Sequence, residues 1–458
     1  MADTIELGHL TKVGFKKQTN PWGGAPLVVG AGDGFEINSD SIKADASIAP
    51  NVGVFGSPFQ RPGSPDKFLV AGDLVADLYY QDWAHRLLGM IFADAVTALG
   101  SGAHRHDLTM RTSISGIDGT LVIPGDNGVR EYGSAKVTGV KLRWDEGDQR
   151  AKITATLACH DFNLNVGSPD DDFVVASVAA ANGVLTILAP ALAQFTPSPL
   201  FMTKVVGITT ITVVFVCEDR WGNLYTKTIT QADFTSEVWT DTTYVRKVVS
   251  ATISNLAGTG NVKVGVTNGV NNASTIAAIT EEASREVSLF SQLEFLINRQ
   301  GAGAVAAATD EQFLKSLEIE IQLNTDQRVT SEFGNRISEP SLAGSDFAKV
   351  MVSIELSAHS NRNRDRLYDA LQAGQLKAKA TLTGAQIASS GVAHSIVVWL
   401  NGIQFPSADG PNVGGAGVQP VTFSGEAHLV AAVPTGFPSG ADEPTMLQIT
   451  NGLATVIV

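Results

Sequence analysis

The sequence predicts a mainly β protein in which two related β domains flank a smaller β module. Three observations support this prediction. The chain has 45 glycines and many Val, Thr and Ala residues, a composition typical of strands joined by turns. A strand-then-helix pattern occurs twice, and a run of short strands lies between the two copies. We therefore expect domains at 1–173, 174–280 and 281–458, the outer two being β-sandwich or barrel domains with one short flanking helix each.

The first copy of the repeated pattern is FLVAGDLVADLYYQDWAHRLLGMIF, residues 68–92. Its first half places apolar residues on every second position with Asp73 and Asp77 between them, which indicates a strand with one polar face. Its second half places Ala84, Leu87 and Leu88 at helical spacing. Asp82 would cap the N-terminus of this helix.

The second copy is FAKVMVSIELSAHSNRNRDRLYDAL, residues 347–371. A shift of 280 positions aligns its strand phase and its helix phase with those of the first copy. The strand-like segments 34–42 and 315–323 precede the two copies at similar spacing. A hairpin-like segment at 135–159 follows the first copy, and a corresponding pair of strands at 394–405 and 421–433 follows the second. The agreement of these features favours an internal duplication over chance alternation.

A long segment rich in Pro, Gly and polar residues precedes the repeated strand in each copy, at 46–67 and 324–346. Proline and glycine disfavour regular structure, so we expect two loops. Loops of this length without structure of their own are usually functional or disordered. We expect both to be cleaved by protease in free subunits and protected in an assembly.

The segment between the copies reads as short strands separated by turns such as RWGN, AGTGN and NGVNN. This pattern predicts a small sandwich resembling an immunoglobulin-like module. No helical counterpart of the repeated unit occurs within it.

Composition and motifs argue against several classes of function. The formal net charge of −14 disfavours general binding to nucleic acid. Sequence motifs of nucleotide-binding, hydrolytic or zinc enzymes are not found, so we expect no enzyme, no cofactor and no metal site. Cys159 and Cys217 lack metal or redox spacing and are expected to be free thiols. The first 22 residues lack the apolar run of a signal peptide, and no membrane span is expected.

Several of these features resemble the tail tube (major tail) proteins of long-tailed bacteriophages. The resemblance rests on GFKKQTNPWGGAPL with Gly14, Thr19 and Gly23, on the strand, long loop, strand and helix of 35–92, and on REYGSAKVTGVKLRW. The second copy contributes QFPSADGPNVGGAGVQPVTF. The resemblance to tail tube proteins covers both outer segments of the chain. The middle segment resembles the immunoglobulin-like modules found on phage virion proteins.

The resemblance implies a virion building block made in the host cytoplasm. Many tube proteins form hexameric rings, so a duplicated chain would close a pseudo-sixfold ring with three copies, and stacked rings would form the tube. Expected partners are other copies of the chain, a tape-measure protein, tail tip or terminator proteins, and genomic DNA that passes without specific binding. A capsid or decoration protein, or an extracellular β-sandwich adhesin, is the alternative.

On this interpretation the acidic strand faces line the channel and the long loops contact neighbouring subunits. The candidate channel-lining residues are Asp73, Asp77, Glu318, Glu320 and Glu355. The candidate inter-subunit residues are Phe55, Phe59, Arg61, Arg328, Phe333 and Arg336. Lys141 and Arg143 lie in the proposed hairpin, so the channel is not expected to be uniformly acidic.

Overall fold

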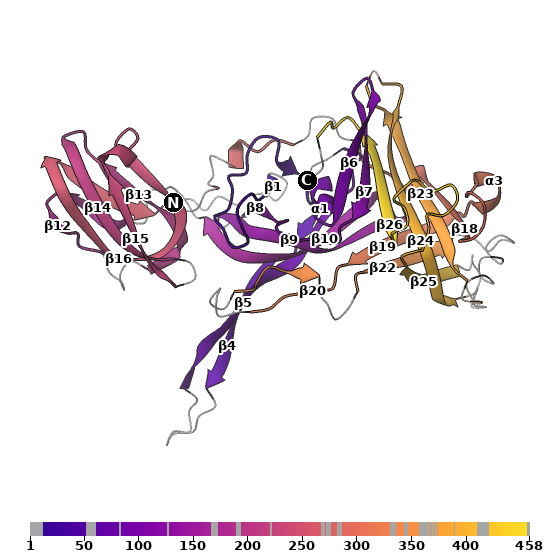
Figure 1. Ribbon diagram of the computed structural model, residues 1–458, viewed down its shortest axis with the longest axis horizontal. Coiled ribbons are helices and arrows are strands. Elements are labelled where there is room, and N and C mark those ends of the chain that lie inside the picture. The colour runs from indigo at the N-terminus through magenta and orange to yellow at the C-terminus, as the bar shows by residue number, and fades with distance from the viewer. Residues whose placement is uncertain are drawn as a thin grey trace.

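The computed structural model confirms the mainly β fold (Figure 1). The residues that the structure describes are 12–51, 61–81, 84–125, 128–165, 173–188, 194–219, 222–266, 271, 276–281, 286–329, 336–342, 347–356, 365, 369, 372, 374–388, 390–409 and 421–455.

One continuous sheet joins the two outer segments of the chain. Its central strands, in spatial order, are β5 (Arg61–Asp77), β10 (Asp148–Asn165), β9 (Gly128–Asp145), β19 (Leu314–Gln322), β22 (Lys349–Leu356) and β25 (Val421–Ala427). The pairing of β9 with β19 links the first half of the chain to the second. All of these neighbours are antiparallel.

The alternation predicted from sequence is present in these strands. Val70 and Leu74 of the first copy and Val350 and Ile354 of the second are buried. They belong to a single hydrophobic cluster with residues of both halves, so the two segments predicted as separate domains share one core. Burial of an apolar side chain stabilises the fold by about 1.5–3 kcal/mol, and the shared core couples the halves through that effect.

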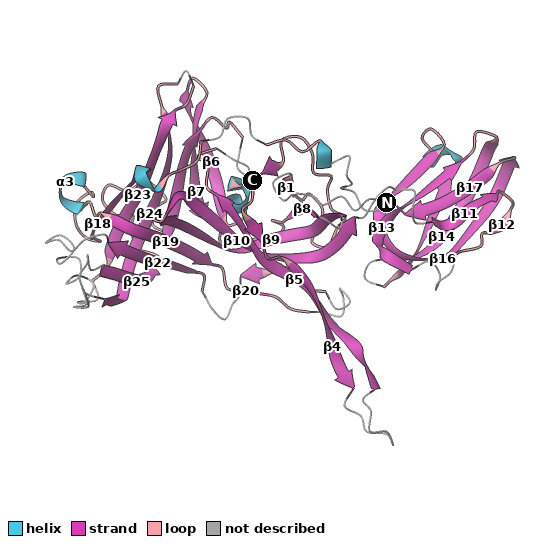
Figure 2. Cartoon of the chain, turned by 180° about the vertical axis from the view of Figure 1, so that it is seen from behind, coloured by secondary structure: helices cyan, strands magenta, loops and turns pink. Residues whose placement is uncertain are grey.

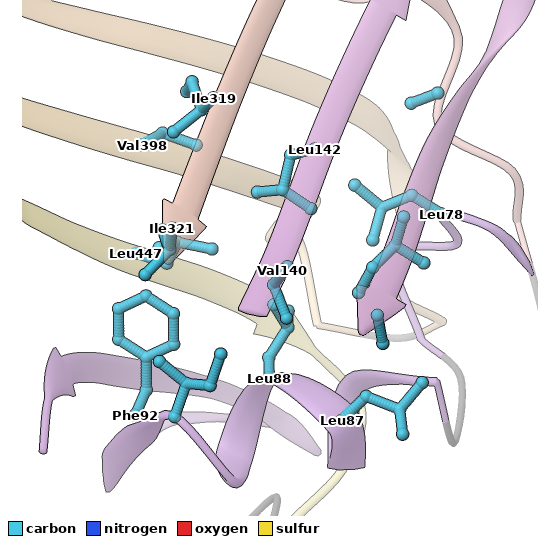
Figure 3. Packing of buried hydrophobic residues seen from close by; sticks show 14 of the residues in the cluster. Leu78, Leu87, Leu88, Phe92, Val140, Leu142, Ile319, Ile321, Val398 and Leu447 are labelled. Atoms are coloured by element: carbon cyan, nitrogen blue, oxygen red, sulfur yellow. The ribbon is translucent and has the colours of Figure 1, made fainter. Parts of the chain in front are cut away.

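The short helix α1 (His85–Gly89) lies on the apolar face of this sheet. Figure 3 shows its Leu88 beside Val140 of β9, and Leu87 belongs to the same buried cluster. Ala84 is the N-cap residue, and Asp82, which was expected to cap the helix, lies outside the described residues. Asp365 and Asp369, 280 positions after the ends of α1, are also helical.

A second sheet covers the core from the other side (Figure 2). Its order is β6 (Phe92–Gly100), β7 (Ala103–Met110), β26 (Thr445–Asn451), β24 (Ala393–Asp409), β23 (Leu376–Gln386) and β18 (Leu293–Arg299). The long strand β24 belongs to both sheets, because its last residues pair with β25. Strands β1 (Val13–Lys17), β2 (Gly34–Phe35) and β8 (Gly119–Gly125) complete the first half.

The two halves repeat the same arrangement in the same direction. The segment 34–42, including β3 (Ser39–Asp40), borders β5 as β19 borders β22. The hairpin β9–β10 then corresponds to β24–β25, and β1–β8 corresponds to β18–β23. Four antiparallel steps separate β5 from β22, so these equivalent strands run the same way. The duplication is therefore head to tail.

The middle module, defined here as residues 173–266, has its own sheet and its own core. Its strands are β11 (Phe173–Ala179), β12 (Gly183–Val184), β13 (Gln194–Lys204), β14 (Ile208–Asp219), β15 (Leu224–Thr230), β16 (Val238–Gly258) and β17 (Asn261–Val266). Phe215 stacks on Trp239 in a cluster that contains no residue of the main core. The module stands at one end of the molecule in Figure 1.

Residues 271 and 276–280, which were assigned to the module from sequence, pack on the first half instead. The Asn271 side-chain oxygen accepts a hydrogen bond from the Val29 backbone N–H at 2.7 Å, and its amide donates to the Leu27 carbonyl at 3.1 Å. Ile276 and Ile279 are buried with Val29. The chain leaving the module therefore returns to the first half before it continues into the second.

Replacing residues 166–270 with a short Gly-Ser linker should leave the rest of the chain folded, because the two cores are separate. Thermal unfolding of the shortened protein should retain the transition of the main body unchanged. A deletion that extends to residue 280 is the matched comparison and should lower that transition, since it removes the buried contacts of Asn271, Ile276 and Ile279. Equal unfolding of the two deletions would contradict this assignment.

The described parts of segment 46–67, residues 46–51 and 61–67, are strands and not the loop that their Pro and Gly content predicted. Strand β4 (Lys43–Asn51) pairs with the first part of β5, and the two form a ribbon that projects from the body (Figure 1). Each strand of such a ribbon has an unpaired outer edge, so a proline can occupy it without removing a ladder hydrogen bond. This explains how Pro50, Pro62 and Pro65 lie in strands.

Candidate functional site

The exposed face of the continuous sheet, called here the polar face, is the most distinctive surface of the protein. Register across the strands aligns its side chains in rows. One row reads Asp77, Lys152, Arg143, Glu318, Ser353 and Ser424, and the next reads Val75, Thr154, Lys141, Glu320, Met351 and Glu426. Side chains opposite each other in antiparallel strands lie about 4.5–5.5 Å apart, so each row is a connected strip.

The structure brings all five sequence-predicted carboxylates to this one face. Glu318 and Glu320 flank Lys141, with Nζ–O distances of 3.0 and 3.3 Å. Glu355 lies 2.8 Å from the Nζ of Lys315. These carboxylates are paired with lysines, so the face is a network of opposite charges with more acids than bases.

The two aspartates of β5 differ in their environments. Asp73 is exposed and accepts a hydrogen bond of 2.8 Å from the Thr156 hydroxyl. Asp77 is only 6% exposed, and its carboxylate is held by Asn38 at 2.6 Å and Arg150 at 2.9 Å. Asp77 therefore presents little charge to the surface, although it lies in the predicted strand phase.

Neighbouring carboxylates raise the pKa of three cations of the polar face, Lys141, Arg143 and Lys315. Burial lowers the pKa of Lys141, but the hydrogen bonds and charges of Glu318 and Glu320 outweigh burial and raise it. A hydrogen bond from Arg143 to Asp145 raises the pKa of that arginine, and Glu355 raises the pKa of Lys315. Carboxylates dominate the potential at each of these cations, which disfavours an approaching phosphate.

The sequence analysis did not predict that the basic residues of the hairpin β9–β10 would lie on the same face as the five carboxylates. Lys141, Arg143 and Lys152 alternate with apolar residues in the hairpin β9–β10, just as the acids do in β5 and β19. That alternation could have placed them on the same face. Of these three, Lys141 pairs with Glu318 and Glu320, and that pairing needed the β9–β19 register, which joins residues far apart in sequence.

The predicted inter-subunit residues are only partly described. Phe55, Phe59 and Phe333 lie outside the described residues, and Arg61 is placed in β5 by its backbone alone. Arg328 is exposed and pairs with Asp326 within its own segment.

Arg336, by contrast, binds within the chain. Its guanidinium lies 3.1 Å from the Asp161 carboxylate and 3.8 Å from the centre of the Phe68 ring. The carbonyl of the next residue, Ile337, accepts a hydrogen bond from the Trp22 indole at 3.1 Å. The described part of the second long segment is thus fixed on the first half of the chain.

The same segment reaches a buried lysine. Lys136 is 1% exposed, and its ammonium binds the Glu339 carboxylate and donates to the carbonyl of Ile114 at 2.6 Å. Asp118 lies close to this pair and is also 1% exposed. Burial raises the pKa of Asp118 to about 6, against the opposing charge of Lys136.

This raised pKa predicts a pH dependence of stability. The folded state holds the proton of Asp118 more tightly than the unfolded chain, whose aspartates titrate near 3.9. The free energy of unfolding should therefore fall as pH rises from about 4 to about 6. Asp118→Asn should remove that part of the fall, measured by denaturant unfolding at a series of pH values. Identical pH slopes in the two proteins would contradict the assignment.

His106, in the sequence AHRHD, is buried and bound within the chain. His106 donates from Nδ1 to Asp94 at 2.8 Å and lies 3.0 Å from the Leu453 carbonyl through Nε2. Burial lowers the pKa of His106, but Asp94 outweighs burial and raises it. The described residues contain no cluster of three or more metal-ligating side chains.

The two cysteines are free and buried in different sheets. Burial raises the pKa of both thiols, that of Cys217 to about 12. Both are therefore poor nucleophiles, as a structural role requires.

Comparison with known proteins adds no family assignment. A scan against protein-family models finds no match, and a search of curated proteins finds no similar sequence. Within the described part of the chain, no helix is long and apolar enough to cross a membrane.

Proposed function

We propose that this protein is a structural subunit that assembles head to tail into rings, and that stacked rings form the tail tube of a long-tailed bacteriophage. The observation that carries the proposal is the joint between β9 and β19. This pairing joins two equivalent halves of one chain head to tail. A head-to-tail contact of this kind closes a ring when successive units repeat it with a fixed rotation.

The repeat also suggests which surfaces close the ring. In the second half, the last residues of β24 occupy the position that β9 has in the first half. The segment 34–42 occupies the position of β19. The end of β24 in one copy would therefore lie against segment 34–42 of the next copy.

The size of such a ring suits a channel. Each half supplies four strands to the continuous sheet when segment 34–42 is included. Three chains would therefore contribute about 24 strands, more than the 16–18 at which a β-barrel encloses water. A two-faced sheet in such a ring places its apolar face on the subunit core, so the polar face is left for the channel.

The paired charges of the polar face suit a conduit for DNA. Lys141, Arg143 and Lys315 each already have a carboxylate partner, so a phosphate would have to displace that partner. A close charge pair in water is worth about 1 kcal/mol, and screening limits its reach to about 8–10 Å. DNA would therefore pass without being held. A tape-measure protein before ejection, and tail tip or terminator proteins at the ends, are the further partners proposed.

Two measurements test the assembly. Negative-stain electron microscopy of the purified protein should reveal rings or tubes with an open channel, and native mass spectrometry should give three chains per ring. Mixing Asn38→Cys with Gln404→Cys chains should give disulfide-linked dimers under oxidation, because these positions lie on the two surfaces proposed to meet. Each single variant alone is the control, since the native thiols are buried.

A protein that stays monomeric at all concentrations would contradict the proposal. Monomers that bind glycans through the middle module would support the adhesin alternative. Association with preformed capsids in place of ring formation would support a decoration protein.

A further inference from the structure

We propose that the outer edge of β6 receives the β4–β5 ribbon of a second copy in the adjacent ring, so that this pairing joins rings into a tube. The inference rests on the proposed function. It identifies which parts of two copies meet between rings, whereas the ring joint described above lies within a ring.

The first observation is the unpaired edge of β6. On its inner side β6 pairs with β7 from Phe92 to Gly100. On its outer side no described residue pairs with its backbone. An open strand edge of nine residues presents a row of N–H and C=O groups to another strand.

The chemistry of this edge favours pairing. Natural edge strands are usually protected by lysine, proline or a bulge. Strand β6 reads FADAVTALG and has neither lysine nor proline, and the one irregularity in its register with β7 lies at its end, between Ala98 and Gly100. Its one charged residue, Asp94, is bound to His106 and fully buried. Ala95, Thr97, Ala98 and Leu99 are exposed, and none of them repels a neighbouring strand.

The opposite end of the same sheet is protected, which makes the edge of β6 distinctive. Strand β18 covers β23 from Leu376 to Leu382. Beyond β18, the Ala385 N–H donates to the Glu286 carboxylate at 2.9–3.0 Å. The outer edge of β18 is in turn bridged by Glu311 and Gln312. Protection is therefore built into one end of this sheet, and the described residues supply none at the other.

The second observation identifies the occupant. The β4–β5 ribbon projects from the body on the side away from the β6–β7 hairpin, as both views show (Figures 1 and 2). A two-stranded ribbon is marginally stable by itself, so a third strand would stabilise it. The outer edge of β4, the edge away from β5, has no pairing partner among the described residues.

These two edges complement each other in a stack. A ribbon that projects from one end of a subunit can reach the far end of the next subunit, where β6 lies. Such a contact joins different surfaces on the two copies and does not close, so it generates a filament. Addition of a strand to an open sheet edge is also a common mode of polypeptide recognition, in which backbone hydrogen bonds provide the affinity.

The test places a charge on the edge without disturbing the core. Thr97→Lys substitutes an exposed residue of β6, and lysine at an edge discourages strand pairing. Thr383→Lys, at an exposed position of the protected strand β23, is the matched control. Electron microscopy should show single rings of Thr97→Lys, with at least a tenfold lower proportion of stacked tubes. The control should stack like the wild type.

A second measurement is independent of whether Thr97→Lys folds. Thr97→Cys and Asp45→Cys chains, mixed and treated with a short bismaleimide, should give a crosslinked pair in tubes and none in isolated rings. Two results would overturn the inference while leaving the ring proposal intact. One is that Thr97→Lys forms tubes as the wild type does. The other is that Thr97→Lys loses stacking but the Thr97→Cys and Asp45→Cys chains give no crosslinked pair in tubes. Absence of rings from the wild type would overturn the proposed function itself.

Discussion

Replacing Glu318 and Glu320 with glutamine should make the polar face bind DNA at low salt. Both carboxylates hold Lys141, which has the raised pKa expected of a lysine between two acids. Glutamine keeps the shape of the side chain and removes its charge, so three unpaired lysines would line each ring. At about 1 kcal/mol for each close pair, the affinity of an assembled ring for duplex DNA should rise by about tenfold to a hundredfold.

The gain in affinity for DNA should be electrostatic, and it should therefore decline steeply as salt is added. Binding of fluorescent duplex DNA to assembled protein at low and at physiological salt measures it. Glu294→Gln with Glu311→Gln is the control, because it removes the same charge near β18 and leaves the polar face unchanged. DNA binding by both double variants, or by neither, would show that Glu318 and Glu320 do not face the passing duplex.

Trp144→Ala should destabilise both halves of the main body at once. Trp144 is fully buried in β9, opposite Leu317 of β19, at the joint between the halves. Truncating a buried tryptophan costs about 3–5 kcal/mol. Because residues of both halves pack in one cluster, the free energy of unfolding should fall by this amount for β5 and β22 alike.

Hydrogen exchange followed by mass spectrometry measures the effect strand by strand. Phe215→Ala, which truncates a fully buried ring of the middle module, is the control and should affect only that module. Loss of protection confined to the first half after Trp144→Ala would mean that the two halves have separate cores.

The strand pattern of this fold was predictable because burial imposes it locally. Leu74 and Ala76, or Ile319 and Ile321, alternate with polar residues wherever one face of a strand meets the core. The same argument predicted that Asp73, Glu318, Glu320 and Glu355 share a polar phase. Aligning the two copies with a shift of 280 residues predicted a strand followed by a helix in each. The structure contains β5 followed by α1, and β22 followed by the helical residues Asp365 and Asp369.

Features set by distant residues could not be predicted. The ion pairs of Lys141 depend on the β9–β19 register, and the burial of Asp77 depends on Asn38 and Arg150. The Pro and Gly content of the β4–β5 ribbon wrongly predicted a loop, because proline is compatible with a strand that has an unpaired edge. The shared core required knowing that the halves pair with each other, which neither copy reveals by itself.

The central claim is that the polar face lines the channel of a three-chain ring. A cryo-electron microscopy reconstruction of the assembled protein tests it most directly. We expect three copies around the axis, with Asp73, Lys141, Glu318 and Glu320 facing the open channel and the middle module on the exterior. A ring whose channel is lined by another surface, with the polar face buried between subunits or turned outward, would contradict the claim.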